Sequence, residues 1–306
     1  MGDWSAILFY YNNTVEFYER SEYMKTGLVL EGGAMRGIYT AGVLDVFMEE
    51  NIQVDGIAGV SAGAIHGASY VSDQPGRNLR YHKKYCRDER FMSMRSWLRT
   101  GDIVGYEFCY DIIPYYLDPF DFKQFAKSKT EFFAGVTNIE TGSAELLSSR
   151  AEKELLANIH ASASLPVFSR IVEIGDRKYL DGGIGDSIPW EAFKRIGYHR
   201  QIVVLTRPEG YRKGPDKLMP IIRMKYRKYP KFIEACKNRH RVYNETLDKL
   251  EAAEKSGEIL LIRPSRKIRI KRTEKNPKVV QAQYDLGRED ALKRLDDVRK
   301  YLGLQR

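Results

Sequence analysis

Short apolar runs alternate with segments of mixed polarity in the first quarter of the chain. Residues 27–31 and 54–60 are apolar, and each run ends at a glycine-rich segment. Residues from about 36 to 50 have the pattern of a helix, and so do residues from 61 to about 71, where small residues allow close packing against a sheet. The order strand, helix, strand, helix predicts a βαβ unit, in which helices cover a parallel sheet.

The later pattern predicts further strands and helices. Strands are expected over residues 131–138, 143–147, 201–206 and 258–262, a hairpin over 170–180, and helices over 152–163, 218–254 and about 281–302, with a break at Pro230. Residues 90–125 are aromatic and irregular, and their rings either line an apolar substrate groove or form an ordinary core under a long loop. No repeat or linker divides the chain, so one α/β domain is the simplest interpretation.

Composition separates three regions of the chain. Residues 1–23 are unlike the rest, and we expect an appended arm or a mis-assigned start there, since their acidic residues do not suit a secretory signal. Residues 24–209 carry the strand and glycine patterns and predict the catalytic core. Residues 210–306 are basic and mainly helical, and we expect them to belong to the same domain.

The net charge of +9 is unevenly distributed. From Gly210 to the end there are 27 Lys and Arg against 13 Asp and Glu, whereas the first 209 residues hold 23 against 28. Such a basic region is either attracted to an anionic surface or is an ordinary solvated surface. We expect residues 210–275 to contact anionic membranes, with Tyr226, Tyr229 and Phe232 reaching the interface. No nucleic-acid-binding motif is present, so no specific nucleic acid partner is expected.

Cysteine usage bears on the compartment. The three cysteines (Cys86, Cys109 and Cys236) are an odd number without metal-type spacing, which favours free thiols in a reducing environment. No apolar run approaches the roughly 18 residues of a transmembrane helix. We therefore expect a cytoplasmic protein that is at most peripheral at a membrane surface. The sequence indicates nothing about the oligomeric state.

A nucleophile elbow is indicated where the second apolar run ends. The segment there fits the pattern G-x-S-x-G, in which a sharp turn between strand and helix lifts a serine hydroxyl clear of the sheet: Gly59-Val60-Ser61-Ala62-Gly63. The pattern alone is weak, but the strand before it and the helix after it are the context that the elbow needs. A helix N-terminus also favours negative charge near the serine oxygen. Ser61 is the predicted nucleophile.

The first glycine-rich segment predicts an anion cradle. It consists of Gly32, Gly33, Ala34, Met35, Arg36 and Gly37. Ile38 and Tyr39 follow where a P-loop needs Lys and Ser or Thr, and Ala34 stands where a dinucleotide fingerprint needs its second glycine. Small residues let backbone N–H groups approach a reacting carbonyl, so we expect this loop to hold an oxyanion.

Two kinds of group could activate Ser61. A Ser-His-Asp triad needs a histidine late in the chain, and His199 and His240 are the candidates. His240 lies in a basic helical run and is expected at the surface. A triad is also disfavoured because an α/β-hydrolase places its nucleophile after several strands, whereas one good strand precedes Ser61 here.

An aspartate is the other candidate base. Asp181 ends a predicted strand and is followed by Gly182 and Gly183, which allow a carboxylate in a cramped site. Aspartate is a poor base at its ordinary pKa near 3.9, but burial beside the serine would raise that pKa. The alternative for Asp-Gly-Gly alone is a plain turn.

Together these segments resemble the patatin-like phospholipase family. The glycine loop, the elbow and Asp-Gly-Gly occur in the order and approximate spacing of that family, residues 163–168 resemble a further block, and the resemblance covers about residues 25–206. It implies a three-layer α/β/α sandwich with a mostly parallel central sheet. It also implies a dyad of Ser61 and Asp181, an oxyanion hole over residues 32–37, and no metal or cofactor. Ala34 departs from the family's usual third glycine, and its methyl group is tolerable if φ is negative.

The resemblance implies a serine acyl hydrolase that cleaves ester bonds of lipids, of phospholipase A, lysophospholipase or esterase type. The alternative is a non-catalytic binding or regulatory protein on the same fold, which uses its basic C-terminal region to bind membrane or nucleic acid. The sequence indicates neither the lipid nor the acyl position.

Overall fold

The computed structural model describes residues 24–304, so the arm expected at residues 1–23 lies outside the described residues. In the described range one mixed sheet has the strand order β5-β6-β3-β2-β1-β7-β8, with β4 paired to β3. The strands are β1 (Lys25–Leu30), β2 (Gly56–Val60), β3 (Glu131–Asn138), β4 (Ala144–Ser149), β5 (Val172–Ile174), β6 (Arg177–Asp181), β7 (Tyr198–Val204) and β8 (Ile259–Ile262). The five strands from β3 through β2, β1 and β7 to β8 are parallel, while β4, β6 and β5 add antiparallel pairs.

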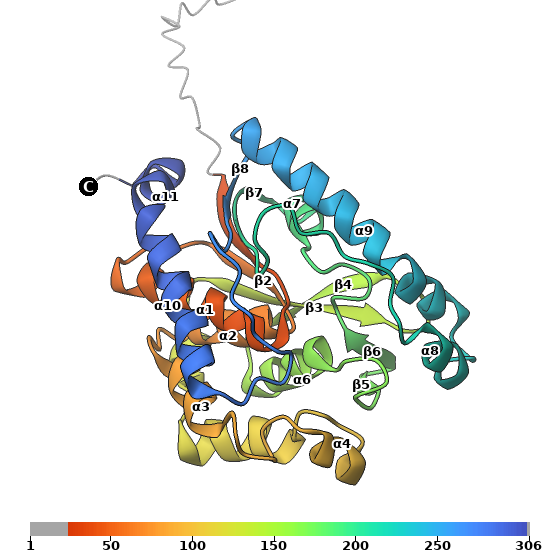
Figure 1. Ribbon diagram of the computed structural model, residues 1–306. Coiled ribbons are helices and arrows are strands. Elements are labelled where there is room, and N and C mark those ends of the chain that lie inside the picture. Colours follow the sequence, from red (N-terminus) through yellow and green to blue (C-terminus); the bar gives the residue numbers. More distant parts are fainter. Residues whose placement is uncertain (1–23, 305–306) are drawn as a thin grey trace, which may run out of the picture.

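Helices connect the strands and cover both faces of the sheet (Figure 1). They are α1 (Ile38–Glu49), α2 (Ala62–Val71), α3 (Arg77–Tyr85), α4 (Met94–Thr100), α5 (Phe122–Lys127), α6 (Glu152–Ala163), α7 (Trp190–Arg195), α8 (Met219–Lys225), α9 (Pro230–Lys255), α10 (Pro277–Lys293) and α11 (Leu295–Leu302), with a 3₁₀ turn η1 (Ala34–Gly37) and a π-helix η2 (Glu107–Leu117). None of these helices is both long and apolar enough to cross a bilayer, as far as the described residues go.

The alternation of side chains along the central strands builds two cores. Leu28 and Leu30 of β1 pack with residues of α1, α2, α6 and α10, whereas Val29 between them packs with residues of α7 and α9. Successive side chains of a strand point to opposite faces, so one strand contributes to both layers. The predicted α/β fold, a mostly parallel sheet between two helical layers, is confirmed.

The C-terminal region packs onto the core through α10. Two glycines let α10 and α1 approach closely: a Cβ at Gly42 would lie 2.2 Å from the Tyr284 carbonyl oxygen, and one at Gly287 would lie 2.0 Å from the Tyr39 carbonyl oxygen. The Tyr284 hydroxyl also donates to the buried carboxylate of Asp45 at 2.6 Å. These contacts join α10 closely to α1.

Some element boundaries differ from the sequence predictions. Residues 90–125 are not irregular, since they contain α4, η2 and α5. A π-helix closes its hydrogen bonds five residues apart and leaves no 3.6-residue period to detect. The helix expected from residue 36 begins with the 3₁₀ turn η1, and the last expected helix begins at Pro277 and is interrupted at Arg294. The break at Pro230 is confirmed, because α9 starts there.

The membrane-contacting residues expected in the basic region are largely wrong. Tyr226 is 1% exposed and Phe232 is fully buried, and both lie in a hydrophobic cluster with Val167 and Leu180. The Tyr226 hydroxyl accepts a hydrogen bond from the Val167 amide at 3.1 Å. Tyr226 and Phe232 therefore help to pack the region of α8 and α9 against the core and form no interfacial face.

Candidate active site

Ser61 lies in the turn between β2 and α2. Its backbone has φ 54° and ψ −119°, a conformation that residues other than glycine rarely adopt. The flanking glycines are needed for close approach: a Cβ at Gly59 would lie 2.6 Å from the Ala64 nitrogen, and one at Gly63 would lie 2.3 Å from the Leu30 carbonyl oxygen. This is the strained strand-to-helix turn that the G-x-S-x-G pattern predicts.

The glycine loop runs directly beside this turn. A Cβ at Gly32 would lie 2.9 Å from the Val60 carbonyl oxygen and 3.2 Å from Ser61 Cβ. Within the described range the amides of Gly33 and Ala34 donate to no protein acceptor, whereas the Arg36 amide already donates to the Gly33 carbonyl oxygen at 3.1 Å. The amides that are free for an oxyanion are therefore at the start of the predicted cradle and do not include that of Arg36.

Ala34 adopts the backbone conformation that its family position would reserve for glycine. Its φ is 48°. We expected the methyl group of Ala34 to be tolerable if φ were negative, and that condition is not met. An alanine in this region is strained by about 1–2 kcal/mol. The start of the loop thus carries local strain, as does Ser61, and both residues border the same cavities.

The order of the strands in the sheet brings Asp181 close to Ser61. It ends β6, which pairs with β3, and β3 in turn pairs with β2, at whose end Ser61 lies. The carboxylate is 3% exposed and accepts a hydrogen bond from the Gly183 amide at 2.7 Å. The Ser61 side chain also lies close enough to this carboxylate to lower its pKa. The two residues that the sequence singled out, 120 positions apart, lie together.

Burial adjusts the basicity of Asp181. Desolvation raises the pKa of its carboxyl above the ordinary value, while the positive charge of Arg239, the Gly183 amide and the Ser61 hydroxyl oppose that rise. Gly182 allows the close packing behind it, since a Cβ there would lie 2.1 Å from the Gly135 carbonyl oxygen. The arrangement gives a carboxylate that is a better proton acceptor than one in water.

The two histidines considered for a triad, His199 and His240, lie in different positions relative to Ser61. His199 lies at the amino end of β7, and because β7 runs parallel to β2 through β1, this is the opposite edge of the sheet from Ser61. His240 is half-buried and lines a cavity with Ser61, so its expected surface position is wrong. No hydrogen bond joins His240 to Ser61 or Asp181 among the described residues.

Supporting residues were missed by the sequence analysis. Ser162 of α6 accepts the Ser61 amide hydrogen at 2.8 Å and donates to the Gly135 carbonyl oxygen at 2.6 Å, which ties the elbow to β3. Glu31, 3% exposed, accepts hydrogen bonds from the Thr206 amide at 2.6 Å and the Tyr243 hydroxyl at 2.7 Å, which fixes the start of the glycine loop. The small-residue run around Ser162 was the one available signal.

Two cavities of opposite character meet at Ser61. The first is mainly apolar and is lined by residues of α2, η2, α5, α6 and the segment between η2 and α5, among them Ile65, Ile113, Phe120, Phe122, Leu155 and Ile159. The second is polar and lies between the glycine loop, the Asp181 turn and α9. Ala34, Ser61 and Leu165 line both. Of the two roles considered for the aromatic segment, a groove wall and a core under a loop, the structure gives it both.

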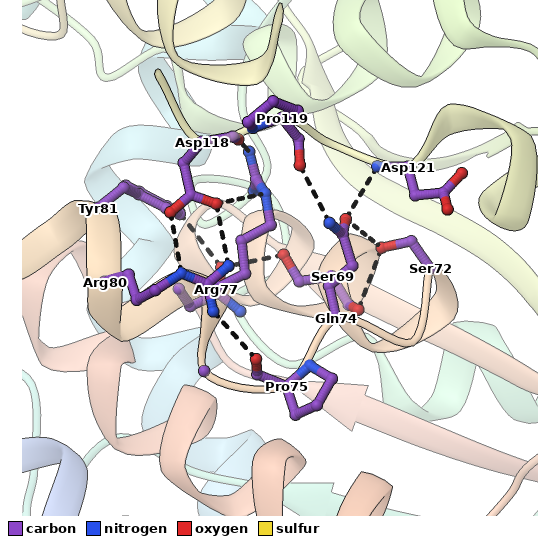
Figure 2. Close-up of polar contacts among 12 residues, drawn as sticks. Ser69, Ser72, Gln74, Pro75, Arg77, Arg80, Tyr81, Asp118, Pro119 and Asp121 are labelled. Atoms are coloured by element: carbon purple, nitrogen blue, oxygen red, sulfur yellow. Dashed lines mark hydrogen bonds and ion pairs between the residues drawn. The ribbon is translucent and has the colours of Figure 1, made fainter. Parts of the chain in front are cut away.

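A polar network holds the wall of the apolar cavity in place (Figure 2). Asp118, which follows η2, forms ion pairs with Arg80 at 3.1 Å and with Arg77 at 3.6 Å. The Gln74 side chain donates to the Pro119 carbonyl oxygen at 3.0 Å. These contacts fix the segment between η2 and α5 against α3 and the turn before it.

Comparison with known families fits this geometry. The model of the family described as patatin-like phospholipase matches residues 28–194, more than half of the chain. The chain belongs to the patatin-like phospholipase family. Residues 229–303 match a second model, a domain of unknown function, DUF6363. The patatin-like match ends before the loop and helix α9 that complete the polar cavity.

Several proteins are similar to this patatin-like chain. The uncharacterized protein YjjU of Escherichia coli K12 is 27% identical over 243 residues, which are 72% of this chain and 67% of YjjU. Lysophospholipase NTE1 of Debaryomyces hansenii is 30% identical over 181 residues, which are 56% of this chain and 11% of that protein. The crystal structure of VipD from Legionella pneumophila aligns over 90% of this chain and 67% of its own, with TM-score 0.44 and 12% identity.

Proposed function

We propose that this chain is a serine hydrolase that cleaves acyl esters of lipids. The observation that supports this function is the position of Ser61: it lies beside Asp181 at the place where an apolar cavity meets a polar one. An acyl chain in the apolar cavity would bring its ester carbonyl to the serine hydroxyl. Burial of the chain would supply binding energy of about 0.8 kcal/mol for each methylene group.

The first chemical step is acylation of Ser61. Asp181 accepts the hydroxyl proton while the serine oxygen attacks the ester carbonyl, and the amides of Gly33 and Ala34 donate to the resulting oxyanion. Collapse of the tetrahedral intermediate breaks the bond to the alcohol oxygen, which takes the proton from Asp181 and leaves. The acyl group is then bound to Ser61 as an ester.

The second step is hydrolysis of that acyl-enzyme. Asp181 accepts a proton from water as the water oxygen attacks the acyl carbonyl, and the same amides hold the second oxyanion. The fatty acid leaves and Ser61 regains its proton. With a carboxylate as the base, a large part of the rate must come from stabilisation of the oxyanion.

The dependence on acyl length tests this function. Monoacylglycerols with acyl chains of 4 to 16 carbons, kept below their aggregation concentrations, should show kcat/KM that rises by about fourfold per added methylene until the apolar cavity is filled. Hydrolysis should be absent in the Ser61→Ala variant. A flat profile would contradict the assignment of the cavity. Binding of long-chain esters without any turnover would favour the non-catalytic alternative.

We also propose that α4 brings the molecule to a lipid surface. Met94 is 51% exposed and Leu98 is 76% exposed, and their spacing places them on one face of the helix. Arg99 is exposed beside them and suits anionic headgroups, and Arg95, also exposed, is paired with Glu89. The segments on either side of α4 contribute Met92 and Val104 to the apolar cavity, so a membrane at α4 would lie near that cavity.

A double substitution tests the surface role of α4. Met94→Ser with Leu98→Ser should weaken co-sedimentation with vesicles containing anionic lipid by about tenfold, since roughly 1.4 kcal/mol of apolar burial is lost. Leu292→Ser is the matched control, because Leu292 is also 51% exposed but lies on α10. Equal binding by the double variant and the control would rule out α4 as the contact.

A further inference from the structure

The polar cavity beside Ser61 is crowded with cations. Five of them come from four separate segments, namely the glycine loop, the loop after β7, α9 and the loop before α10: Arg36, Arg207, Lys213, Arg239 and Arg272. Four of the five lie beyond residue 194, where the patatin-like match ends. Three acidic residues line the same cavity, Glu31, Asp181 and Asp216.

None of these five cations has a carboxylate within ion-pair distance in the described part of the chain. The Arg239 guanidinium donates to the Gly183 carbonyl oxygen. Lys213 Nζ lies 3.4 Å from Ser187 Oγ, and the buried Nε of Arg36 has no protein acceptor. Glu31 accepts hydrogen bonds from the Thr206 amide and the Tyr243 hydroxyl, and its charge offsets part of theirs without forming an ion pair with any of them. A group of unpaired cations around one cavity fits an anionic ligand.

The cations raise each other's electrostatic energy. Burial and then the charge of Arg239 lower the pKa of Lys213 to about 7. Burial and then the charge of Arg207 lower the pKa of Arg36 to about 10. Burial is the larger cause of both shifts and the neighbouring arginine the second, and a bound anion would favour the charged forms of both groups. The cavity is therefore prepared for negative charge.

The aromatic residues of the cavity do not suit a quaternary ammonium group. Such a group binds over open aromatic faces or against carboxylates. Here the Arg207 guanidinium lies 4.2 Å from the centre of the Tyr211 ring, and Lys213 Nζ lies 3.7 Å from the centre of the Tyr243 ring. Both faces are already taken by cations of the cavity itself. A choline headgroup would meet repulsion there.

We infer that this cavity binds a phosphate monoester headgroup, so that the protein prefers acyl esters of glycerol phosphate to choline-bearing or uncharged lipids. The inference rests on the proposed function, because it assumes an acyl ester at Ser61. Arginine suits this role, since its planar guanidinium bonds two phosphate oxygens at once. The doubly charged phosphate lies in the polar cavity while the acyl chain lies in the apolar one.

Three lipids with one acyl chain test the inference: 1-oleoylglycerol 3-phosphate, its phosphocholine counterpart and 1-oleoylglycerol. All are assayed below their aggregation concentrations. For the full chain, kcat/KM for the phosphate monoester should exceed that for the uncharged ester at least tenfold. In the double variant Arg207→Gln with Lys213→Met this ratio should fall at least tenfold, mainly through KM.

A matched variant controls for general electrostatic attraction. Arg212→Gln with Lys249→Met makes the same two side-chain replacements, but these side chains are paired with Asp248 and Glu191 outside the cavity. This control should keep the ratio of the unchanged protein. A ratio that falls equally in both double variants would overturn the inference, because long-range attraction would then explain the preference.

The possible results of this assay distinguish a failure of the headgroup preference from a failure of the proposed ester hydrolysis. Ser61-dependent hydrolysis of all three lipids at similar kcat/KM overturns the inference and leaves the proposed function intact. If no ester is cleaved, the proposed function fails, and calorimetric titration of the Ser61→Ala variant with the two charged lipids still measures the headgroup preference. A further result would be that inorganic phosphate binds the unchanged protein but not the Arg207→Gln, Lys213→Met variant, while the protein shows no preference for the phosphate lipid. That result would assign the cavity to free phosphate and overturn the headgroup role.

Discussion

Replacement of Ser61 by alanine is expected to lower kcat for long-chain ester hydrolysis by at least about 10⁴-fold, because no other group can form the acyl-enzyme. Asp181→Asn should lower kcat by at least about 10³-fold, since an amide cannot accept the serine proton. Both substitutions nearly conserve volume at sites that are already buried. Circular dichroism and the midpoint of thermal unfolding should therefore stay close to those of the unchanged protein.

Asp186→Asn is the matched control for the aspartate. Asp186 lies in the same turn, and burial raises its pKa to about 6, yet its carboxylate accepts from the Ile188 amide and lines neither cavity. Its substitution should change kcat by less than about tenfold. Near-native activity of Asp181→Asn would remove the dyad from the mechanism.

The acid limb of the pH profile follows from the same assignment. Asp181 must be ionised to accept a proton, so kcat/KM for an uncharged ester should fall as the pH drops through the pKa of this group. Because burial raises that pKa, the fall should occur at higher pH than for a carboxyl group in water.

The second large effect is expected on stability. Asp118→Ala should lower the free energy of unfolding by about 3 kcal/mol, because it removes the carboxylate that faces the nearly buried Arg77. The Arg77 side chain is 6% exposed, and burial already lowers the pKa of its guanidinium, which Asp118 opposes. Figure 2 shows Asp118 in contact with both Arg77 and Arg80, and Asp118 directly follows η2, which lines the apolar cavity. Long-chain ester hydrolysis should therefore weaken as well.

Chemical denaturation measures the change, with Glu89→Ala as the control. Glu89 pairs with Arg95 at the surface, where the two side chains are 53% and 67% exposed. Loss of such a pair changes the free energy of unfolding by about 0–1 kcal/mol. If Asp118→Ala were no more destabilising than Glu89→Ala, the network would not be holding this wall.

The sequence predicted the parts of the site that depend on local backbone geometry. The elbow at Ser61 and the glycine loop are strand-to-helix turns, and their small residues let the two turns pack closely against each other and against β1. Asp181 was a candidate because two glycines follow it at the end of a predicted strand, and because the Asp-Gly-Gly segment resembles one of the patatin-like family. Its approach to Ser61 depends on β6 pairing with β3, and strand order is not encoded in any local pattern.

Other features depended on contacts that periodicity does not identify. Tyr226 and Phe232 were expected to reach a membrane interface, but both side chains pack in a hydrophobic cluster of the core. The charge imbalance of the C-terminal region was visible, whereas the convergence of Lys213, Arg239 and Arg272 on one cavity was not. Distant segments supply these residues, so only the folded chain brings them together.

Covalent labelling tests the central claim most directly, namely that Asp181 activates Ser61 at the junction of the two cavities. The protein is treated with a fluorophosphonate that carries a long alkyl chain, and the modified peptide is identified by mass spectrometry. We predict one adduct, on Ser61, that forms in the unchanged protein, is absent in Ser61→Ala and forms far more slowly in Asp181→Asn. An adduct on another residue, or equal labelling rates for the unchanged protein and Asp181→Asn, would contradict the account.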